Sequence, residues 1–165
     1  MKIYCDMDGF LAKWNPEASI EEVTAPGYFA NREMETKVAD AMKMMIRDGY
    51  DVQILTSVFN DDHSRKEKIR WLEINCPFFD TRKVNFCVYG ENKSESVSAS
   101  AEDILIDDFT PNLKEWTGIG IKFLNGINGT KGTWDGYTIS VNSSASVLAS
   151  TIEAIAEKYQ RELHR

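Results

Sequence analysis

Near the N-terminus the chain reads Ile3-Tyr4-Cys5-Asp6-Met7-Asp8-Gly9, and the interpretation of the remaining sequence starts from this stretch. Strand-forming residues lead directly into two aspartates one residue apart, and a glycine then permits a sharp turn. Because side chains alternate along a strand, we expect Asp6 and Asp8 to face one spot where the strand ends. Two carboxylates at one spot repel each other, and a bound divalent cation is the usual remedy. On this stretch alone, a strand followed by a polar turn explains the residues equally well, since Asp and Gly are ordinary turn residues.

The composition is that of one globular domain. The chain has 165 residues, of which 42% are hydrophobic and 27% charged, enough to bury a substantial core. We therefore expect a single domain over residues 1–165, with a small insertion at about 10–35. The net charge of −7 argues against a nucleic-acid duplex or an anionic membrane surface as the main partner, because both attract Lys and Arg. A basic pocket for a single phosphate is compatible with that charge.

The cysteines and the termini indicate a cytoplasmic protein. Cys5, Cys76 and Cys87 lie in or beside apolar runs and form no C-x-x-C pair, so we interpret them as small buried hydrophobes in a reducing compartment. The N-terminus reaches a strand within three residues, which leaves no room for a signal peptide. No apolar run approaches membrane-spanning length.

Strands and helices are predicted to alternate along the chain. The first expected strand starts directly after Lys2, and four more cover about 50–57, 84–90, 103–108 and 120–124. Expected helices cover about 16–23, 35–48, 64–76, a short segment from 110, and 143–165. Residues 134–141 fit either an edge strand or a packed loop. This order indicates an α/β domain of three layers with a mostly parallel five-stranded sheet.

Local signals mark where helices start and where turns lie. Asn15-Pro16 and the capping box Ser19-x-x-Glu22 are alternative starts for the first helix. Ser64-x-x-Glu67 is a second capping box, which places His63 at a helix start. Asn125-Gly126 and Asn128-Gly129 predict turns. The polar segment 91–102 is expected to be a loop with at most one helical turn.

Oxygen-bearing side chains follow three of the predicted strands. Asp6 and Asp8 end the first strand, Thr56 and Ser57 the second, and Asp107 and Asp108 the fourth. Ligands of open parallel sheets bind at the carboxyl ends of the strands, so these side chains are expected to meet there. A carboxylate-rich site without histidine suits Mg²⁺ better than zinc. We do not expect His63 or His164 to act as ligands.

These strand ends resemble the motifs of the haloacid dehalogenase (HAD) superfamily of phosphatases. Asp6-Met7-Asp8-Gly9 is similar to motif I, Ile54-Leu55-Thr56-Ser57 to motif II, and Ile104-Leu105-Ile106-Asp107-Asp108 to motif IV. Lys93, within Glu91-Asn92-Lys93-Ser94, is the best-placed candidate for the motif III lysine. The resemblance implies a Rossmann-like HAD fold with a small helical cap inserted after the first strand.

Within the superfamily, the chain most resembles the 5′(3′)-deoxyribonucleotidase family. The resemblance rests on Asp6 to Ala12, Pro26 to Phe29, Lys66 to Leu72, and the Asn92-Lys93-Ser94 loop ahead of Leu105 to Asp108. It implies a Mg²⁺-dependent phosphomonoester hydrolase whose substrate is a small phosphorylated molecule, namely a nucleotide. Val58 after Ser57 and the Ser/Ala run beyond Lys93 depart from the family pattern.

The resemblance also implies a role for each residue. Asp6 would be the nucleophile that forms an aspartyl-phosphate, and Asp8 the general acid and base. Thr56, Ser57 and Lys93 would hold the phosphate. The metal would be held by Asp6, Asp107 and the backbone carbonyl of Asp8, with Asp108 orienting its water or Lys93. The aromatic side chains of the insertion either stack on a base or sugar, or simply close the insertion onto the core: Phe10, Trp14, Tyr28 and Phe29.

Other functions stay open at this point. A HAD phosphatase for another small phosphate, such as a sugar phosphate, has the same motifs. A non-catalytic module that binds Mg²⁺ and phosphate would be expected to have lost a motif I aspartate. A purely structural domain leaves the acidic strand ends unexplained, and the acidic balance disfavours a polynucleotide end-phosphatase. The sequence leaves open whether the chain forms a homodimer.

Overall fold

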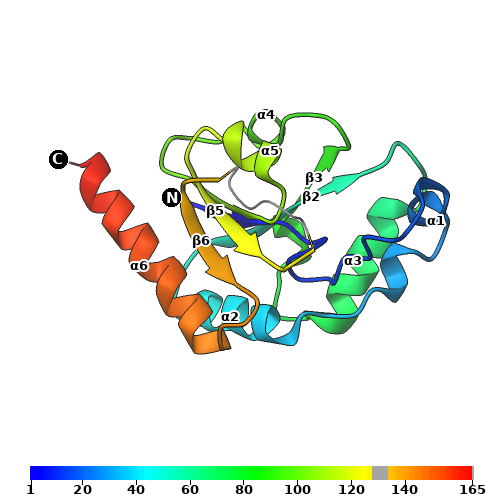
Figure 1. Cartoon of the computed structure of the whole chain (residues 1–165), viewed down its shortest axis with the longest axis horizontal. Coiled ribbons are helices and arrows are strands. Elements are labelled where there is room, and N and C mark those ends of the chain that lie inside the picture. The colour runs from blue at the N-terminus through cyan, green and yellow to red at the C-terminus, as the bar shows by residue number, and fades with distance from the viewer. Residues whose placement is uncertain (128–133, 165) are drawn as a thin grey trace.

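A parallel sheet forms the centre of the molecule. The computed structural model describes residues 1–127 and 134–164 (Figure 1). Within them lies a six-stranded sheet in the order β3-β2-β1-β4-β5-β6, with every neighbouring pair parallel. The strands are β1 (Ile3–Cys5), β2 (Val52–Val58), β3 (Val84–Val88), β4 (Ile104–Asp107), β5 (Ile119–Leu124) and β6 (Tyr137–Ser140).

The predicted α/β class is confirmed, but the prediction of five strands is wrong. Residues 137–140 form an edge strand, β6, in which Tyr137 pairs with Ile121 and Ile139 with Phe123. A run of four residues carries too weak an alternation to be recognised alone, and its pairing with β5 decides its conformation. The turn predicted at Asn128-Gly129 lies outside the described residues.

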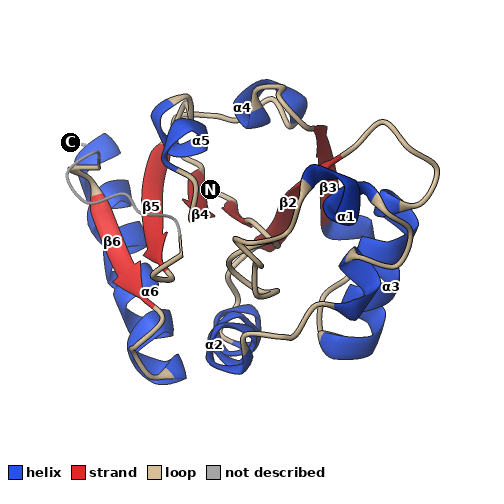
Figure 2. Cartoon of the chain, turned by 45° about the vertical axis from the view of Figure 1, so that its right-hand side comes forward, coloured by secondary structure: helices blue, strands red, loops and turns tan. Residues whose placement is uncertain are grey.

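Helices cover both faces of this sheet (Figures 1 and 2). The α-helices are α1 (Ile20–Thr24), α2 (Thr36–Arg47), α3 (Ser64–Asn75), α4 (Lys93–Ser96), α5 (Thr110–Lys114) and α6 (Ala145–Leu163), with 3₁₀ turns η1 (Phe29–Asn31) and η2 (Thr81–Lys83). Ile3 and Cys5 of β1 join the larger core cluster with α2, α3 and α6, whereas Tyr4 points to the opposite face and packs edge-on against Trp116. The strands are therefore apolar on both faces, as parallel sheets require.

The three cysteines are free and buried, as the sequence predicted. Their packing among apolar side chains accounts for their place in the chain. None of the described helices has the length and apolar character needed to cross a membrane.

The first helix begins at its capping box. Glu22 N–H donates to Ser19 Oγ at 3.2 Å and Ser19 N–H donates to Glu22 Oε2 at 2.8 Å, so both bonds of the motif form. The alternative start at Asn15-Pro16 is wrong, and those residues precede the helix in a turn. Reciprocal satisfaction of two backbone donors outweighs a proline at the first position.

The capping box predicted at Ser64-x-x-Glu67 is wrong. Asp61 Oδ1 instead accepts from the N–H groups of His63, at 3.0 Å, and Ser64, at 2.7 Å. Glu67 is turned to another use, because its carboxylate accepts from Gly27 N–H at 2.6 Å and from Phe29 N–H at 3.2 Å. The tertiary contact of Glu67 with the backbone of Gly27 and Phe29 thus replaces the local contact with Ser64.

Residues 10–35, which we call the cap, are held at both ends by backbone bonds. Lys13 N–H donates to the Glu33 carbonyl at 2.8 Å, and Glu35 N–H donates to the Leu11 carbonyl at 2.7 Å. These two bonds join the first residues of the cap to its last residues, so both ends of the cap lie beside the end of β1. This pairing puts its residues over the carboxyl edge of the sheet.

Side chains four residues apart at the start of α3 fasten the middle of the cap. His63 Nε2 lies 3.1 Å from the Thr24 carbonyl, Glu67 binds the backbone described above, and Trp71 Nε1 donates to the Arg32 carbonyl at 2.7 Å. Residues four apart share one face of a helix. One stripe of α3 therefore fixes the position of the cap over the sheet.

We expect Glu67→Ala to lower the free energy of unfolding by about 1–3 kcal/mol, because two partly buried N–H groups lose their acceptor. The matched control is Glu73→Ala on the same helix, where an exposed ion pair with Arg70 at 3.3 Å is worth about 0–1 kcal/mol. Urea denaturation of both variants measures the difference. Equal losses would show that Glu67 does not fasten the cap.

Candidate active site

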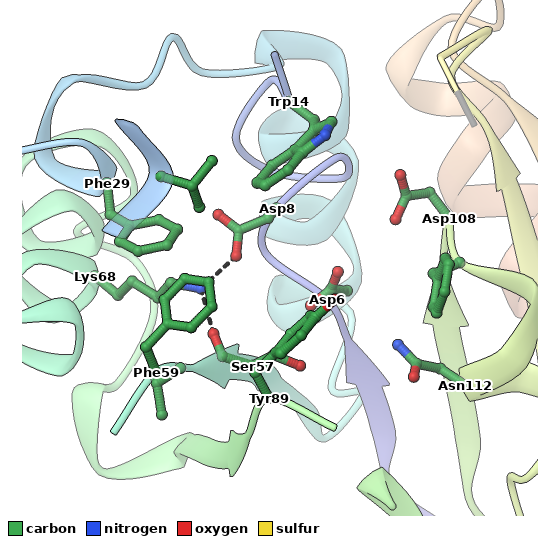
Figure 3. A pocket seen from close by; sticks show the side chains of 13 residues that line it. Asp6, Asp8, Trp14, Phe29, Ser57, Phe59, Lys68, Tyr89, Asp108 and Asn112 are labelled. Carbon is green, nitrogen blue, oxygen red and sulfur yellow. Dashed lines mark hydrogen bonds and ion pairs between the residues drawn. The ribbon is translucent and has the colours of Figure 1, made fainter. Parts of the chain in front are cut away.

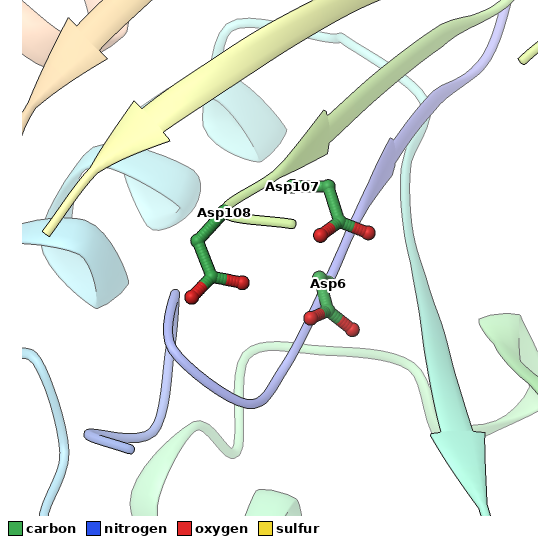
Figure 4. A group of neighbouring side chains, drawn as sticks. All are labelled: Asp6, Asp107 and Asp108. Carbon is green, nitrogen blue, oxygen red and sulfur yellow. The ribbon is translucent and has the colours of Figure 1, made fainter. Parts of the chain in front are cut away.

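Three carboxylates meet at the carboxyl edge of the sheet (Figure 4). Asp6 follows β1, Asp107 ends β4, and Asp108 comes next in the chain. Because β1 and β4 are parallel neighbours, these residues emerge side by side. All three are buried, and one oxygen of each lies within 4.8 Å of the others. Of the side chains expected to meet at the strand ends, Asp6, Asp107 and Asp108 therefore lie together.

Lys93 lies between two of these carboxylates. Its Nζ is 2.8 Å from both Asp6 Oδ1 and Asp107 Oδ2, and only 2% of the residue is exposed. Its position follows from the local sequence, since Asn92 caps α4 by accepting from Ser94 N–H at 2.7 Å. The predicted helical turn in the 91–102 segment is thus the device that turns Lys93 into the site.

Asp108 is packed tightly against the loop that follows β1. Gly9 has a φ of +83°, and a Cβ there would collide with the Asp108 carboxylate. Asn125 Nδ2 donates to Asp108 Oδ2 at 2.7 Å and to the Gly9 carbonyl at 2.9 Å, which joins β5 to both. Glycine is required here for its backbone conformation and for the space it leaves.

Asp8 has a different environment from the three clustered carboxylates. Its Oδ2 accepts from Lys68 Nζ and, at 3.3 Å, from Thr56 Oγ1. Lys68 is wholly buried and also donates to Thr56 Oγ1 at 2.8 Å and to the Ser57 carbonyl at 2.6 Å. Asp8 Oδ1 is buried and makes no hydrogen bond with the described residues. The Asp8 carboxylate therefore stands apart from the acidic cluster.

Burial dominates the electrostatics of the cluster. It raises the pKa of Asp6 to about 7; Lys93 opposes this rise, and Asp107 and Asp8 add to it. Burial and the neighbouring Asp107 and Asp6 raise the pKa of Asp108 well above its ordinary value. Burial alone would lower the pKa of Lys93, but Asp107 and Asp6 outweigh it and leave that pKa raised. Burial is thus the largest cause of both raised aspartate pKa values, and the neighbouring carboxylates add to those two and account for the raised pKa of Lys93.

The residues present fit Mg²⁺. The clustered donors are carboxylate oxygens only, which is the chemistry that Mg²⁺ prefers. Their separation, within 4.8 Å, is near the span of about 4 Å that two oxygens on one Mg²⁺ can reach. Lys93 supplies one positive charge to this group, and a divalent cation would supply the rest. Asp6, Asp107 and Asp108 are the side chains that would hold it.

A cavity of about 270 Å³ opens over Asp6, Asp8 and Asp108 (Figure 3). Its polar side is formed by Asp6, Asp8, Ser57, Lys68, Asp108 and Asn112. Its other walls are apolar and mostly aromatic: Trp14, Val23, Phe29, Val58, Phe59, Tyr89 and Phe109. The volume is at the lower end for small-molecule sites, and a few polar groups at one end of an apolar cavity are typical of them.

The structure divides the four predicted cap aromatics into two pairs. Trp14 and Phe29 line the cavity, and their role in binding substrate stays a prediction. Phe10 does not, because it is buried in the core with its ring 5.0 Å from that of Phe123. Tyr28 lies behind the wall, with its ring 6.0 Å from Trp14 and 5.2 Å from Phe29. For Phe10 and Tyr28 the packing role weighed from the sequence is the one observed.

Several lining residues were not identified from the sequence. Lys68 had a usable signal, because it shares a face of α3 with Ser64 and Leu72, both buried, where a lysine is unexpected. Phe59 and Tyr89, whose rings lie 5.4 Å apart, follow β2 and β3 and had no such signal. Asn112 donates to Asp107 Oδ2 at 2.9 Å, and its place in the short helix α5 gave no sequence signal for a site residue.

A comparison with protein families gives an independent result. The family model described as 5′ nucleotidase, deoxy (pyrimidine), cytosolic type C protein matches residues 3–133, which is most of the chain. The comparison with curated proteins found no match. The family match confirms the resemblance to the 5′(3′)-deoxyribonucleotidases that the strand-end motifs carried.

We expect Gly9→Ala to weaken Mg²⁺ binding, because the added methyl group displaces the Asp108 carboxylate. Gly49→Ala is the control: its φ is +93°, but no described atom lies within 4 Å of the added Cβ. In both variants the free energy of unfolding should fall by about 1–2 kcal/mol, because alanine is strained in a left-handed backbone conformation. The Mg²⁺ concentration that half-saturates a thermal shift should rise for Gly9→Ala alone. An unchanged concentration would contradict the account of the Gly9 contact.

The raised pKa of Asp6 predicts a pH-dependent stability. The folded metal-free protein holds this proton more tightly than the unfolded chain, so stability falls as the pH rises from about 4 to about 7. Mg²⁺ binds the carboxylate and not the acid, so its stabilising effect should be larger at pH 8 than at pH 5. Thermal melts with and without Mg²⁺ measure this, with Asp6→Asn as the control that removes the titrating group. An equal Mg²⁺ effect at both pH values would contradict it.

Proposed function

We propose a substrate and a mechanism for this chain, which belongs to the 5′ nucleotidase, deoxy (pyrimidine), cytosolic type C family and is therefore a phosphomonoester hydrolase. The substrate is a deoxyribonucleoside monophosphate, and the reaction depends on Mg²⁺. The observation that carries this proposal is that one cavity joins two unlike environments: carboxylates and the buried Lys68 at one end, and aromatic rings along its walls.

The walls favour a nucleotide over a sugar phosphate. Trp14 and Phe59 are partly exposed and Tyr89 is exposed, and a nucleobase can stack on such rings for about 1–3 kcal/mol per base. A phosphorylated sugar alone would leave these surfaces without a partner. The cavity volume of about 270 Å³ is on the scale of one small molecule.

The floor of the cavity supports phosphoryl transfer through Asp6. An Asp6 oxygen forms a bond to phosphorus while the bond from phosphorus to the sugar oxygen breaks, giving an aspartyl-phosphate. The acid form of Asp8 transfers its proton to that sugar oxygen, so the nucleoside leaves as an alcohol. The Asp8 carboxylate then takes a proton from water, whose oxygen bonds to phosphorus as the bond to Asp6 breaks, releasing inorganic phosphate.

Lys93 and the backbone near Ser57 would bind the phosphoryl oxygens. Among the described residues Lys93 makes two hydrogen bonds, to Asp6 and Asp107, so one of its three N–H groups is left for substrate. When bound among Asp6, Asp107 and Asp108, Mg²⁺ would offset the negative charge of those oxygens. The Thr56 hydroxyl contacts Asp8, which supports a role in holding Asp8.

The test is phosphate release from a panel of deoxyribo- and ribonucleoside monophosphates, with 5′ and 3′ isomers, and sugar phosphates. We expect release from deoxyribonucleotides with Mg²⁺ and none after chelation. Asp6→Asn should abolish turnover and Asp8→Asn should slow it about 10²–10⁴-fold, whereas Asp62→Asn, at an exposed position, should match the parent chain. Release from sugar phosphates alone would overturn the substrate, and full activity of Asp6→Asn would overturn the mechanism.

A further inference from the structure

Lys68 is the one buried lysine of the cavity whose role the proposed reaction leaves unassigned. It is wholly buried, it belongs to α3, and its Nζ lies 4.3 Å from the centre of the Phe29 ring. A lysine removed from water to this degree requires partners for its charge and for its three N–H groups. The identity of those partners tells what the residue can do.

The Lys68 ammonium group is fully used by the protein. Its three acceptors are Asp8 Oδ2, Thr56 Oγ1 at 2.8 Å and the Ser57 carbonyl at 2.6 Å. An ammonium group has three donors and no acceptor, so none is left for a phosphate oxygen. Lys93 differs in this respect, since it makes two bonds with described residues.

The same bonds select one oxygen of Asp8. Oδ2 accepts from Lys68 (Figure 3) and from Thr56, whereas Oδ1 is buried without a hydrogen bond to any described residue. Asp8 lines the cavity, and Oδ1 is its one oxygen that the described residues leave without a hydrogen bond. The carboxylate is also held away from the acidic cluster of Asp6, Asp107 and Asp108.

We propose that Lys68 is a positioning residue, which holds Asp8 through Oδ2 and leaves Oδ1 to exchange the proton with the leaving group. It acts through Asp8 and not on the phosphate. This inference rests on the proposed function, because it assigns a partner to the acid and base of that reaction. Glu67 and Trp71, which flank Lys68 in the chain, bind α3 to the cap and so fix the position of the helix that carries Lys68.

The test compares two leaving groups in single turnovers with enzyme in excess, so that only the first displacement is measured. A deoxyribonucleoside 5′-monophosphate releases an alkoxide oxygen that needs a proton, whereas para-nitrophenyl phosphate releases a stable anion that does not. We expect Lys68→Met to slow nucleoside release about 10²-fold, within the range for general acid catalysis, and to slow nitrophenol release no more than a few-fold. In an Asp8→Asn background the same substitution should add no further loss of nucleoside release.

Lys66→Met is the matched control, since Lys66 is exposed on the same helix, and it should leave both rates unchanged. Lys68→Gln, which keeps hydrogen-bond donors, serves where Lys68→Met fails to fold, as judged by thermal melting. Equal slowing of both substrates would mean that Lys68 acts on the phosphate or on the fold, and no slowing of either would mean that it has no role. Both results overturn the inference while leaving the proposed function intact, whereas a parent chain inactive on every nucleotide overturns the function itself.

Discussion

Compensation of buried negative charge at the ends of β1 and β4 is the constraint on which the rest of the structure depends. Asp6, Asp107 and Asp108 crowd one place from which water is largely excluded, and buried carboxylates are costly unless they are paired. Lys93 satisfies part of that requirement, which is why a four-residue helix is built to carry it. The negative charge that remains fits a divalent cation, which in the proposed reaction would offset charge on the phosphate.

The second buried lysine extends the same principle to the neighbouring aspartate. Lys68 neutralises Asp8 from the side of α3, so the two motif I aspartates have separate partners and separate environments. Two similar groups can then take unlike roles in one reaction, because surroundings and not residue type set their behaviour. The helix that supplies Lys68 also fastens the cap through Glu67 and Trp71, which ties the chemistry to the walls of the cavity.

How far the sequence could be read depended on the range of the interactions. Strand ends bearing Asp6, Asp107 and Asp108 were predicted because alternation and parallel order are local and topological rules. Glu67 was mistaken for a capping residue because its acceptor role serves Gly27 and Phe29, forty and thirty-eight residues away. Thr56 was predicted to hold phosphate, and only the structure brings its hydroxyl to Asp8. Phe59 and Tyr89 meet only after β2 and β3 have paired, so no local pattern could place them in the cavity wall.

Attack of the Asp6 carboxylate on phosphorus is the step on which the proposed reaction depends. The most direct measurement is to mix the protein with substrate and Mg²⁺, quench in acid, digest, and locate any added phosphate by mass spectrometry. We expect a labile phosphate on the peptide that contains Asp6, present in the parent chain and lost in Asp6→Asn. Turnover with phosphate on another residue, or with none on that peptide at any quench time, would contradict it.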